Sequence, residues 1–143
     1  MNNPDIFLTI FYMNIKKFVI ASIIIFIIAL VWNGIVHTLL TIDESVITSL
    51  FRKNMLDMMW LSLLLTAVLS VIFVFGYIKF TTKGTAKEGI YYGFMFGVLA
   101  CLLVDVNQYI LYPLPLLIVI KWAIFGILEF TLYGFLVSKL YKK

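Results

Sequence analysis

The side chains best suited to chemistry in this 143-residue chain stand inside long apolar stretches, where polar groups are costly. They are Asn33, His37, Asp105, Lys121 and Glu129. A charged side chain at the centre of an apolar membrane helix costs about 2.5–3.5 kcal/mol, so it needs a partner or a water-filled space. Residues of these types exchange protons or form ion pairs, and we take them as candidates for a functional site.

Glu129 is the costliest of these residues because it lies near the middle of the apolar run 116–138. Helical spacing places Trp122, Gly126 and Tyr133 on the same face as Glu129. Apolar surroundings favour the neutral form of a carboxyl group, so we expect Glu129 to hold a proton that it can exchange. The alternative is a protonated carboxyl group that hydrogen-bonds a backbone carbonyl and serves packing alone.

Asp105 and Lys121 flank a tight turn, residues 112–115 with the sequence Tyr-Pro-Leu-Pro. Proline ends one helix and starts the next, so we expect an antiparallel pair with the two charges at a similar depth. We expect the charges to approach within ion-pair or one-water distance, with Asn33 and His37 of an earlier helix facing the same space. The alternative is that Lys121 extends to the lipid headgroups while Asp105 caps a frayed helix end.

His37 is the only histidine and there is only one cysteine, so we expect neither a zinc site nor any other metal site. A b-type haem would need a methionine or the His37 of a second subunit as its other axial ligand, and we expect no cofactor. The sequence also lacks a Walker loop and the Gly-x-Ser-x-Gly motif. We therefore do not expect an enzyme, although Asp105, His37 and Lys121 near the headgroups leave a lipid-acting membrane enzyme open.

Four apolar stretches must position these residues, at about 18–40, 58–78, 89–112 and 116–138. A bilayer core about 30 Å thick is crossed by about 20 helical residues, and all four stretches reach that length. Hydrophobic residues make up 64% of the chain and its mean hydropathy is +1.10, which excludes a soluble domain. The sequence predicts one all-α transmembrane domain over residues 1–143, a membrane four-helix bundle of two antiparallel hairpins in the lipid bilayer. Residues 41–57 are predicted to add a short interfacial helix on the external surface.

Basic residues predict the orientation of these helices in the bilayer. Eight lysines lie near the N-terminus, in the second loop and near the C-terminus, whereas the other side holds only Arg52 and Lys53. Short loops rich in basic residues stay in the cytoplasm, so we expect both termini in the cytoplasm and the protein in the cell (inner) membrane. The same placement at helix ends accounts for the net charge of +4, and we expect no nucleic acid partner.

Glycines recur every four residues on the third apolar stretch, at Gly89, Gly93 and Gly97. A helix face without Cβ atoms lets another helix approach closely, and van der Waals contact is what associates helices in lipid. We expect this face, and Gly126 on the fourth stretch, to pack within the bundle, with an oligomer interface as the alternative.

Several short motifs are shared with one group of proteins. They are the segment 31–37 (Val-Trp-Asn-Gly-Ile-Val-His), the glycine-rich third helix, the Tyr-Pro-Leu-Pro turn, and Trp122, Gly126, Glu129 and Gly134 of the fourth helix. Together they resemble a group of small, uncharacterised bacterial integral membrane proteins with four helices. The resemblance implies the four-helix architecture and directs attention to the polar residues of the first and fourth helices. It implies no substrate.

These observations predict a multi-pass integral membrane protein without an evident catalytic motif. Spanning and packing account for nearly every residue, so we expect an oligomeric or accessory membrane subunit, in a homo-oligomer or with another membrane protein. A proton-linked carrier or channel for a small solute, with Glu129 as the titrating group, is the alternative. A cavity that joins Glu129 to Asn33 and His37 would favour the carrier, and a dry contact at Glu129 would oppose it.

Overall fold

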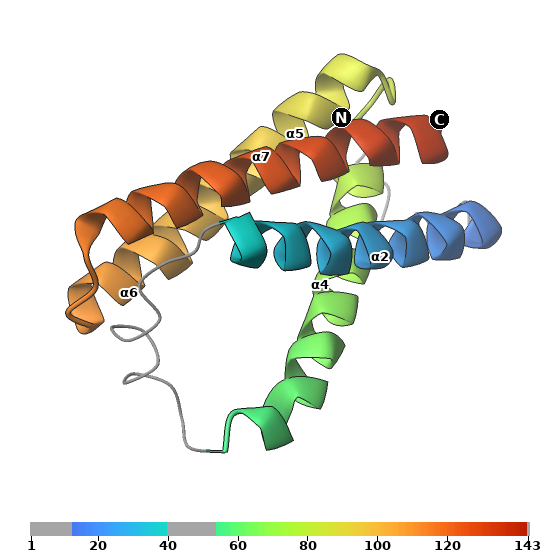
Figure 1. Ribbon diagram of the computed structural model, residues 1–143. Helices are drawn as coiled ribbons and strands as arrows, with labels where there is room; N and C mark the ends of the chain where they lie inside the picture. The colour runs from blue at the N-terminus through green and yellow to red at the C-terminus, as the bar shows by residue number, and fades with distance from the viewer. Residues whose placement is uncertain (1–12, 40–53, 143) are drawn as a thin grey trace.

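The described part of the chain is built from long helices. The computed structural model describes residues 13–39 and 54–142, and these residues form helices and short turns without a strand. The α-helices (Figure 1) are α2 (Ile15–Leu39), α4 (Met59–Phe80), α5 (Ala86–Ala100), the short α6 (Val106–Leu111) and α7 (Leu116–Leu140). A 3₁₀ turn, η1 (Leu56–Met58), precedes α4, and a π-helical turn, η2 (Cys101–Asp105), joins α5 to α6. The all-helical prediction is confirmed for these residues.

Within residues 13–39 and 54–142, four continuous helical segments are long and apolar enough to cross a membrane. They span Ile15–Val36, Leu56–Phe80, Ala86–Leu111 and Leu116–Leu140. A continuous helix satisfies its own backbone hydrogen bonds, which is why apolar runs of this length are helical in lipid. Their length and composition support a multi-pass membrane protein. The predicted external helix at 41–57 falls almost entirely outside the described residues.

Glycines bring the backbones of α5 and α7 into close contact. A Cβ atom on Gly89 would lie 2.3 Å from the carbonyl oxygen of Gly134, and one on Gly93 would lie 2.1 Å from that of Phe130. Gly97 packs in the same way against the next turn of α7. Successive glycines toward the C-terminal end of α5 contact residues that lie progressively nearer the N-terminal end of α7. The two helices therefore run in opposite directions here. The chain's own α7 fills this face, which leaves it closed to a second copy.

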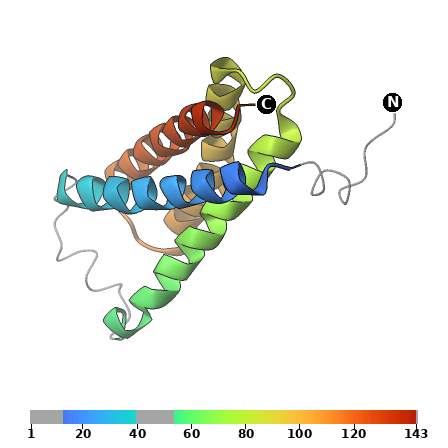
Figure 2. The same ribbon diagram turned by 90° about the vertical axis from the view of Figure 1, so that its right-hand side faces the viewer.

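Helices α2 and α4 cross one another instead of lying side by side along their lengths (Figures 1 and 2). The buried residues of α4 all lie in its second half, between Ser70 and Ile78. Its first half carries exposed side chains such as Trp60, Leu63 and Leu64, and it stands apart from the other helices in both views. The prediction that α2 and α4 form an antiparallel hairpin is therefore not confirmed.

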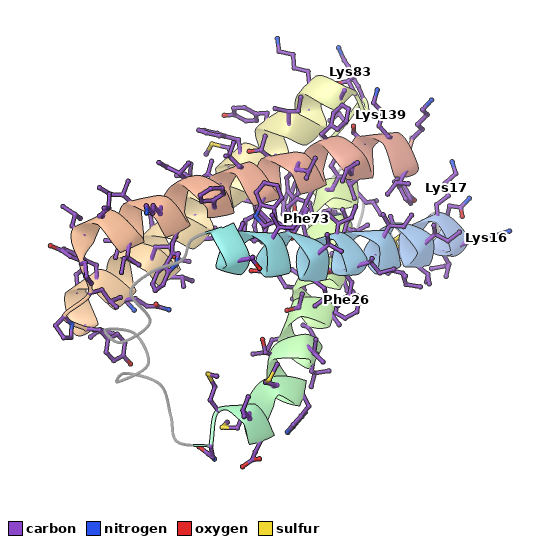
Figure 3. All side chains as sticks on the ribbon, in the orientation of Figure 1. Lys16, Lys17, Phe26, Phe73, Lys83 and Lys139 are labelled. Carbon is purple, nitrogen blue, oxygen red and sulfur yellow. The ribbon has the colours of Figure 1, made fainter. Side chains whose placement is uncertain are left out.

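The apolar core lies where α2, α4 and α7 meet. Ala21, Ile25, Phe73 and Val137 are fully buried there. Phe73, labelled in Figure 3, packs against aromatic rings on α5 and α7, and the distances between ring centroids are 5.0–5.9 Å. Offset and edge-on ring pairs of this kind add about 0.5–1.5 kcal/mol each beyond the area that they bury. This part of the bundle is closely packed.

Lysines gather at the same end of the molecule as this core. Figure 3 shows Lys16, Lys17, Lys83 and Lys139 at that end, which we call the lysine end. The first residues of α2 and the last of α7 also meet there, because the backbone carbonyl of Lys142 accepts a hydrogen bond from the Lys17 side chain at 3.4 Å. Lysines that lie far apart in the chain are thus found at one end of the molecule.

The turn between α4 and α5 is held together by the carboxylate of Glu88. This carboxylate accepts the hydroxyl hydrogen of Thr82 at 2.9 Å and the backbone N–H groups of Lys83 and Thr85 at 3.0 and 3.2 Å. The Thr85 hydroxyl accepts the N–H of Glu88 in return, at 3.2 Å, which completes a capping box at the start of α5. Gly84 takes φ = 64°, which glycine adopts without the steric cost that other residues incur.

Candidate functional site

A cavity of about 530 Å³ lies among α2, the α5–η2–α6 segment and α7, and we call it the large cavity. It lies toward the end of the bundle opposite the lysine end, since it is reached from the second half of α2 and the first half of α7. Its polar lining includes Asn33, Asp105, Gln108 and Glu129. Pockets that hold small molecules typically have volumes of about 300–1,000 Å³, so this cavity is large enough for one.

Glu129 is fixed on the wall of the large cavity through one of its two carboxyl oxygens. The side-chain amide of Asn33 donates to Oε1 of Glu129 at 3.1 Å, and the hydroxyl of Tyr133 donates to the same oxygen. The Asn33 amide also donates to the carbonyl of Ala29 at 2.8 Å, which fixes its orientation. Within the described residues Oε2 makes no hydrogen bond, so it is available to a proton or a ligand.

A second cavity of about 220 Å³ lies on the other side of Glu129, toward the lysine end, and we call it the small cavity. Thr66 and Ser70 of α4 and Tyr133 of α7 supply polar groups to its lining. Asn33 and Glu129 line both cavities. The hydrogen-bonded pair therefore stands between two spaces that reach toward opposite ends of the bundle.

Asp105 reaches the large cavity from the π-helical turn η2. In this turn the backbone N–H of Val106 donates to the carbonyl of Cys101, five residues earlier. A π-turn accommodates one extra residue and changes the direction of the side chains that follow, and such turns are frequent at functional sites. Asp105, Cys101 and Gln108 all line the large cavity from this stretch.

The expected ion pair between Asp105 and Lys121 is not formed among the described residues. Lys121 is not part of the lining of the large cavity, whereas Asp105 is. The Tyr-Pro-Leu-Pro turn sets the depth of both residues, but depth does not decide the direction in which each side chain points. The extra residue in η2 changes that direction for the helix that carries Asp105.

The two predicted residues of α2 have different outcomes. Asn33 faces the large cavity, as expected, and bonds directly to Glu129. His37 is part of α2, but its side chain lies outside the described part of the structure. The space that we expected Asn33 and Asp105 to share therefore exists, with Glu129 in place of Lys121 as a further member.

Gly126 does not have the packing role that we expected from its spacing. A Cβ atom added to it would find no heavy atom within 4 Å. It lines the large cavity instead, one turn from Trp122 and Glu129 on the same face of α7. Its missing side chain widens the cavity, whereas Gly89, Gly93 and Gly97 bring helices together.

The aromatic lining of the cavity was predicted only in part. Trp122, which the sequence placed on the face of Glu129, lines the large cavity, and so do Trp32 and Phe125, which were not proposed as site residues. Trp32 directly precedes Asn33, and Phe125 lies four residues before Glu129, on its face of the helix. Searching for aromatic residues one helical turn from each polar residue would have found Phe125. No sequence signal marks the π-turn.

Comparisons with known proteins do not assign a family. The chain matches no protein-family model, no curated protein and no solved structure. The resemblance to small four-helix membrane proteins therefore gains no support from them. In the part of the chain that the structure describes, no three histidine, cysteine, aspartate or glutamate side chains come together to hold a metal ion. The two cavities and the residues between them are the features of the described chain that bear on its function.

Proposed function

We propose that this multi-pass membrane protein is a proton-linked carrier for a small solute, with Glu129 as the group that exchanges the proton. The observation that carries the proposal is the placement of Glu129 in the lining of both the large and the small cavity. A carrier needs one binding group that can be reached from either side of the membrane in turn. Glu129 lies near the middle of α7, at the depth where such a group is required.

Solute binding and proton binding compete at Glu129 in this proposal. A carboxylate in apolar surroundings is costly unless a positive charge or strong hydrogen-bond donors compensate it. Asn33 and Tyr133 supply two donors to Oε1, and Oε2 takes either the proton or the solute. Because both partners need the same oxygen, arrival of one favours release of the other, which links the two movements.

The orientation in the membrane is part of the proposal. The lysine end faces the cytoplasm of a cell with the protein in its inner membrane, and both termini lie on that side. The large cavity then opens toward the outside and the small cavity toward the cytoplasm. The clustering of Lys16, Lys17, Lys83 and Lys139 at one end supports this orientation (Figure 3).

A flux assay in proteoliposomes tests the carrier. Purified protein is reconstituted with a pH-sensitive dye inside, and solutes of three classes are added outside: a lipophilic cation, a neutral amide and a lipophilic anion. We expect at least one class to move protons across the membrane with the wild type, and much more slowly with Glu129→Gln. If proton movement is the same in both proteins for all three classes, Glu129 is not the coupling group and the proposal fails.

A second candidate function rests on the first half of α4. Residues 59–69 include no buried side chain, and Trp60 and Leu65 are 64% and 59% exposed. In an accessory subunit, a helix of a second copy or of another membrane protein would pack on this segment, whereas in a carrier lipid alone would cover it. Crosslinking through single cysteines at Leu63 and Leu64, followed by native mass analysis in detergent, distinguishes a stable partner from lipid.

A further inference from the structure

We infer that the large cavity binds a small organic cation, such as a lipophilic amine or an onium ion, between Asp105 and Glu129. This inference rests on the proposed function and names the class of solute that the carrier would take. Three properties of the described residues support a cation in this space: the charge of the lining, its aromatic surfaces and the absence of a metal-ion geometry.

Within the described residues, the charge of the lining has one sign. Asp105, on the η2 turn, and Glu129, on α7, are the carboxyl residues of this described lining, and no described lysine or arginine belongs to it. Lys121, the basic residue of α7 that is nearest to Glu129 along the chain, is not part of the lining. A cation is the ligand charge that lowers the cost of holding carboxylates at this depth, and an anion would raise it.

Aromatic side chains surround the same space. Trp32 lines it from α2, Phe96 from α5, and Trp122 and Phe125 from α7. The π-faces of such rings attract positive charge, and the attraction is stronger where the site is desolvated. A carbon-rich cation gains from both the rings and the carboxylates, whereas a strongly hydrated inorganic cation would lose its water.

The polar residues of the lining also favour an organic cation over a metal ion. Divalent metals need several oxygen, nitrogen or sulfur ligands around one point. No group of three such ionisable side chains exists among the described residues. Asn33 and Gln108 add neutral amide groups, which can hydrogen-bond the N–H of an amine but contribute no charge.

Binding is an exchange of partners that leaves the ligand chemically unchanged. Protonated Glu129 releases its proton to water as the cation enters, and the resulting carboxylate remains beside the cation as its counter-ion. Among the described residues, the titratable groups that share a cavity with Glu129 are Tyr133 on α7 and Asp105 and Cys101 on η2. The described part of α4 supplies the hydroxyls of Thr66 and Ser70, and the described side chains of α2 supply the amide of Asn33 and the indole N–H of Trp32. Cation binding should therefore tighten as the pH rises.

Tryptophan fluorescence gives a direct binding measurement. The chain has three tryptophans, of which Trp32 and Trp122 line the large cavity and Trp60 is exposed on α4. In a Trp60→Phe background the signal comes from the cavity alone. Tetraphenylphosphonium is the probe, and tetraphenylborate is its control because it has nearly the same size and apolar surface with the opposite charge. Asp57→Asn, which removes a carboxylate from the exposed start of the α4 segment, is the matched control variant.

We expect saturable quenching by tetraphenylphosphonium that tightens with pH, and dissociation constants raised by about tenfold or more in Asp105→Asn and in Glu129→Gln. Asp57→Asn should bind as the wild type does. Equal binding of the two probe ions, or binding unchanged in both cavity variants, would overturn the assignment of an organic cation.

The two proposals fail in different ways. If the neutral or anionic solute of the flux assay is coupled to protons through Glu129 while tetraphenylphosphonium does not bind, the carrier survives and the cation assignment falls. If tetraphenylphosphonium binds in an Asp105- and Glu129-dependent way but moves no protons across proteoliposomes, the cavity assignment stands and the carrier falls. Both variants replace a carboxylate by an amide of the same shape, and size-exclusion profiles and helical content check that each is folded.

Discussion

Replacing Gly93 by alanine should separate α5 from α7 and destabilise the protein. The added Cβ atom would lie 2.1 Å from the carbonyl oxygen of Phe130, 2.9 Å from its carbonyl carbon and 3.0 Å from the Cα atom of Thr131. All three are backbone atoms, which cannot rotate away, so the helices themselves must move until the shortest contact reaches about 3.4 Å. Overpacking of this kind costs about 1–3 kcal/mol, and the absence of a flexible neighbour places Gly93→Ala near the upper end of that range.

Helix propensity acts in the opposite direction and needs a control. Alanine stabilises a helix interior by about 1 kcal/mol relative to glycine, so the net loss in Gly93→Ala should be about 1–2 kcal/mol. Gly126→Ala adds the same methyl group to α7, where the structure has no heavy atom within 4 Å. Subtracting its effect removes the propensity contribution, and we expect the two variants to differ by about 2–3 kcal/mol.

Unfolding of both variants is measured by titrating mixed micelles with a denaturing detergent and following helical content. The expected order of unfolding free energy is Gly126→Ala at or above the wild type, and Gly93→Ala well below it. If the two variants unfold at the same detergent fraction, the close α5–α7 contact does not exist in the membrane protein. A Gly93→Ala variant that is as stable as the wild type would likewise show that the two helices are not in close contact at Gly93.

Three shorter predictions follow from the same structure. Asp105→Asn and Lys121→Met should have additive effects on unfolding free energy, within about 0.5 kcal/mol, and a larger coupling in the double-mutant cycle would mean that the two charges do interact. Tyr133→Phe removes a hydroxyl that donates to the carboxyl group between the cavities and should cost about 1–3 kcal/mol of stability in the same detergent titration, unlike Tyr91→Phe on an exposed face. Topology reporters should give a cytoplasmic signal after Lys143 and an external signal in the turn at 112–115, and the same signal at both places would contradict the charge argument.

The helices could be predicted because their cause is local. Apolar composition over about 20 residues forces a helix in lipid, whatever the rest of the chain does. The spacing of Gly89, Gly93 and Gly97 likewise predicted a helix face that another helix could approach. Which helix approaches it depends on the whole bundle, and here it is α7. Spacing alone also gave Gly126 a packing role, although the face on which it lies opens into a cavity.

The sequence predicted which polar residues line the cavity but not which of them interact with one another. The energetic cost of polar groups in lipid identified Asn33, Asp105 and Glu129, and all three line the large cavity. The turn at 112–115 gave the depth of Asp105 and Lys121 but not the direction of either side chain. The direction of Asp105 depends on the π-turn at η2, which bears no mark in the sequence, and the expected ion pair is not formed among the described residues.

The crossing of α2 and α4 could not be predicted for a related reason. Hydrophobicity is nearly uniform around membrane helices, so it does not tell which face of α4 meets its neighbours. The thin packing of its first half and the close packing around Phe73 are outcomes of side-chain shape. By contrast, the capping box of Thr85 and Glu88 was visible as Thr-x-x-Glu and was missed.

Infrared difference spectroscopy can detect an exchangeable proton on Glu129, the group on which the proposed carrier depends. The C=O stretch of a protonated carboxyl group is recorded as the pH is changed, in H₂O and in D₂O, for the wild type and for Glu129→Gln. We expect a band that appears as the pH falls, shifts in D₂O because water reaches the carboxyl group from a cavity, and is missing in the variant. A spectrum with no Glu129-dependent band at any pH, or with a Glu129 band that does not shift in D₂O, would contradict it.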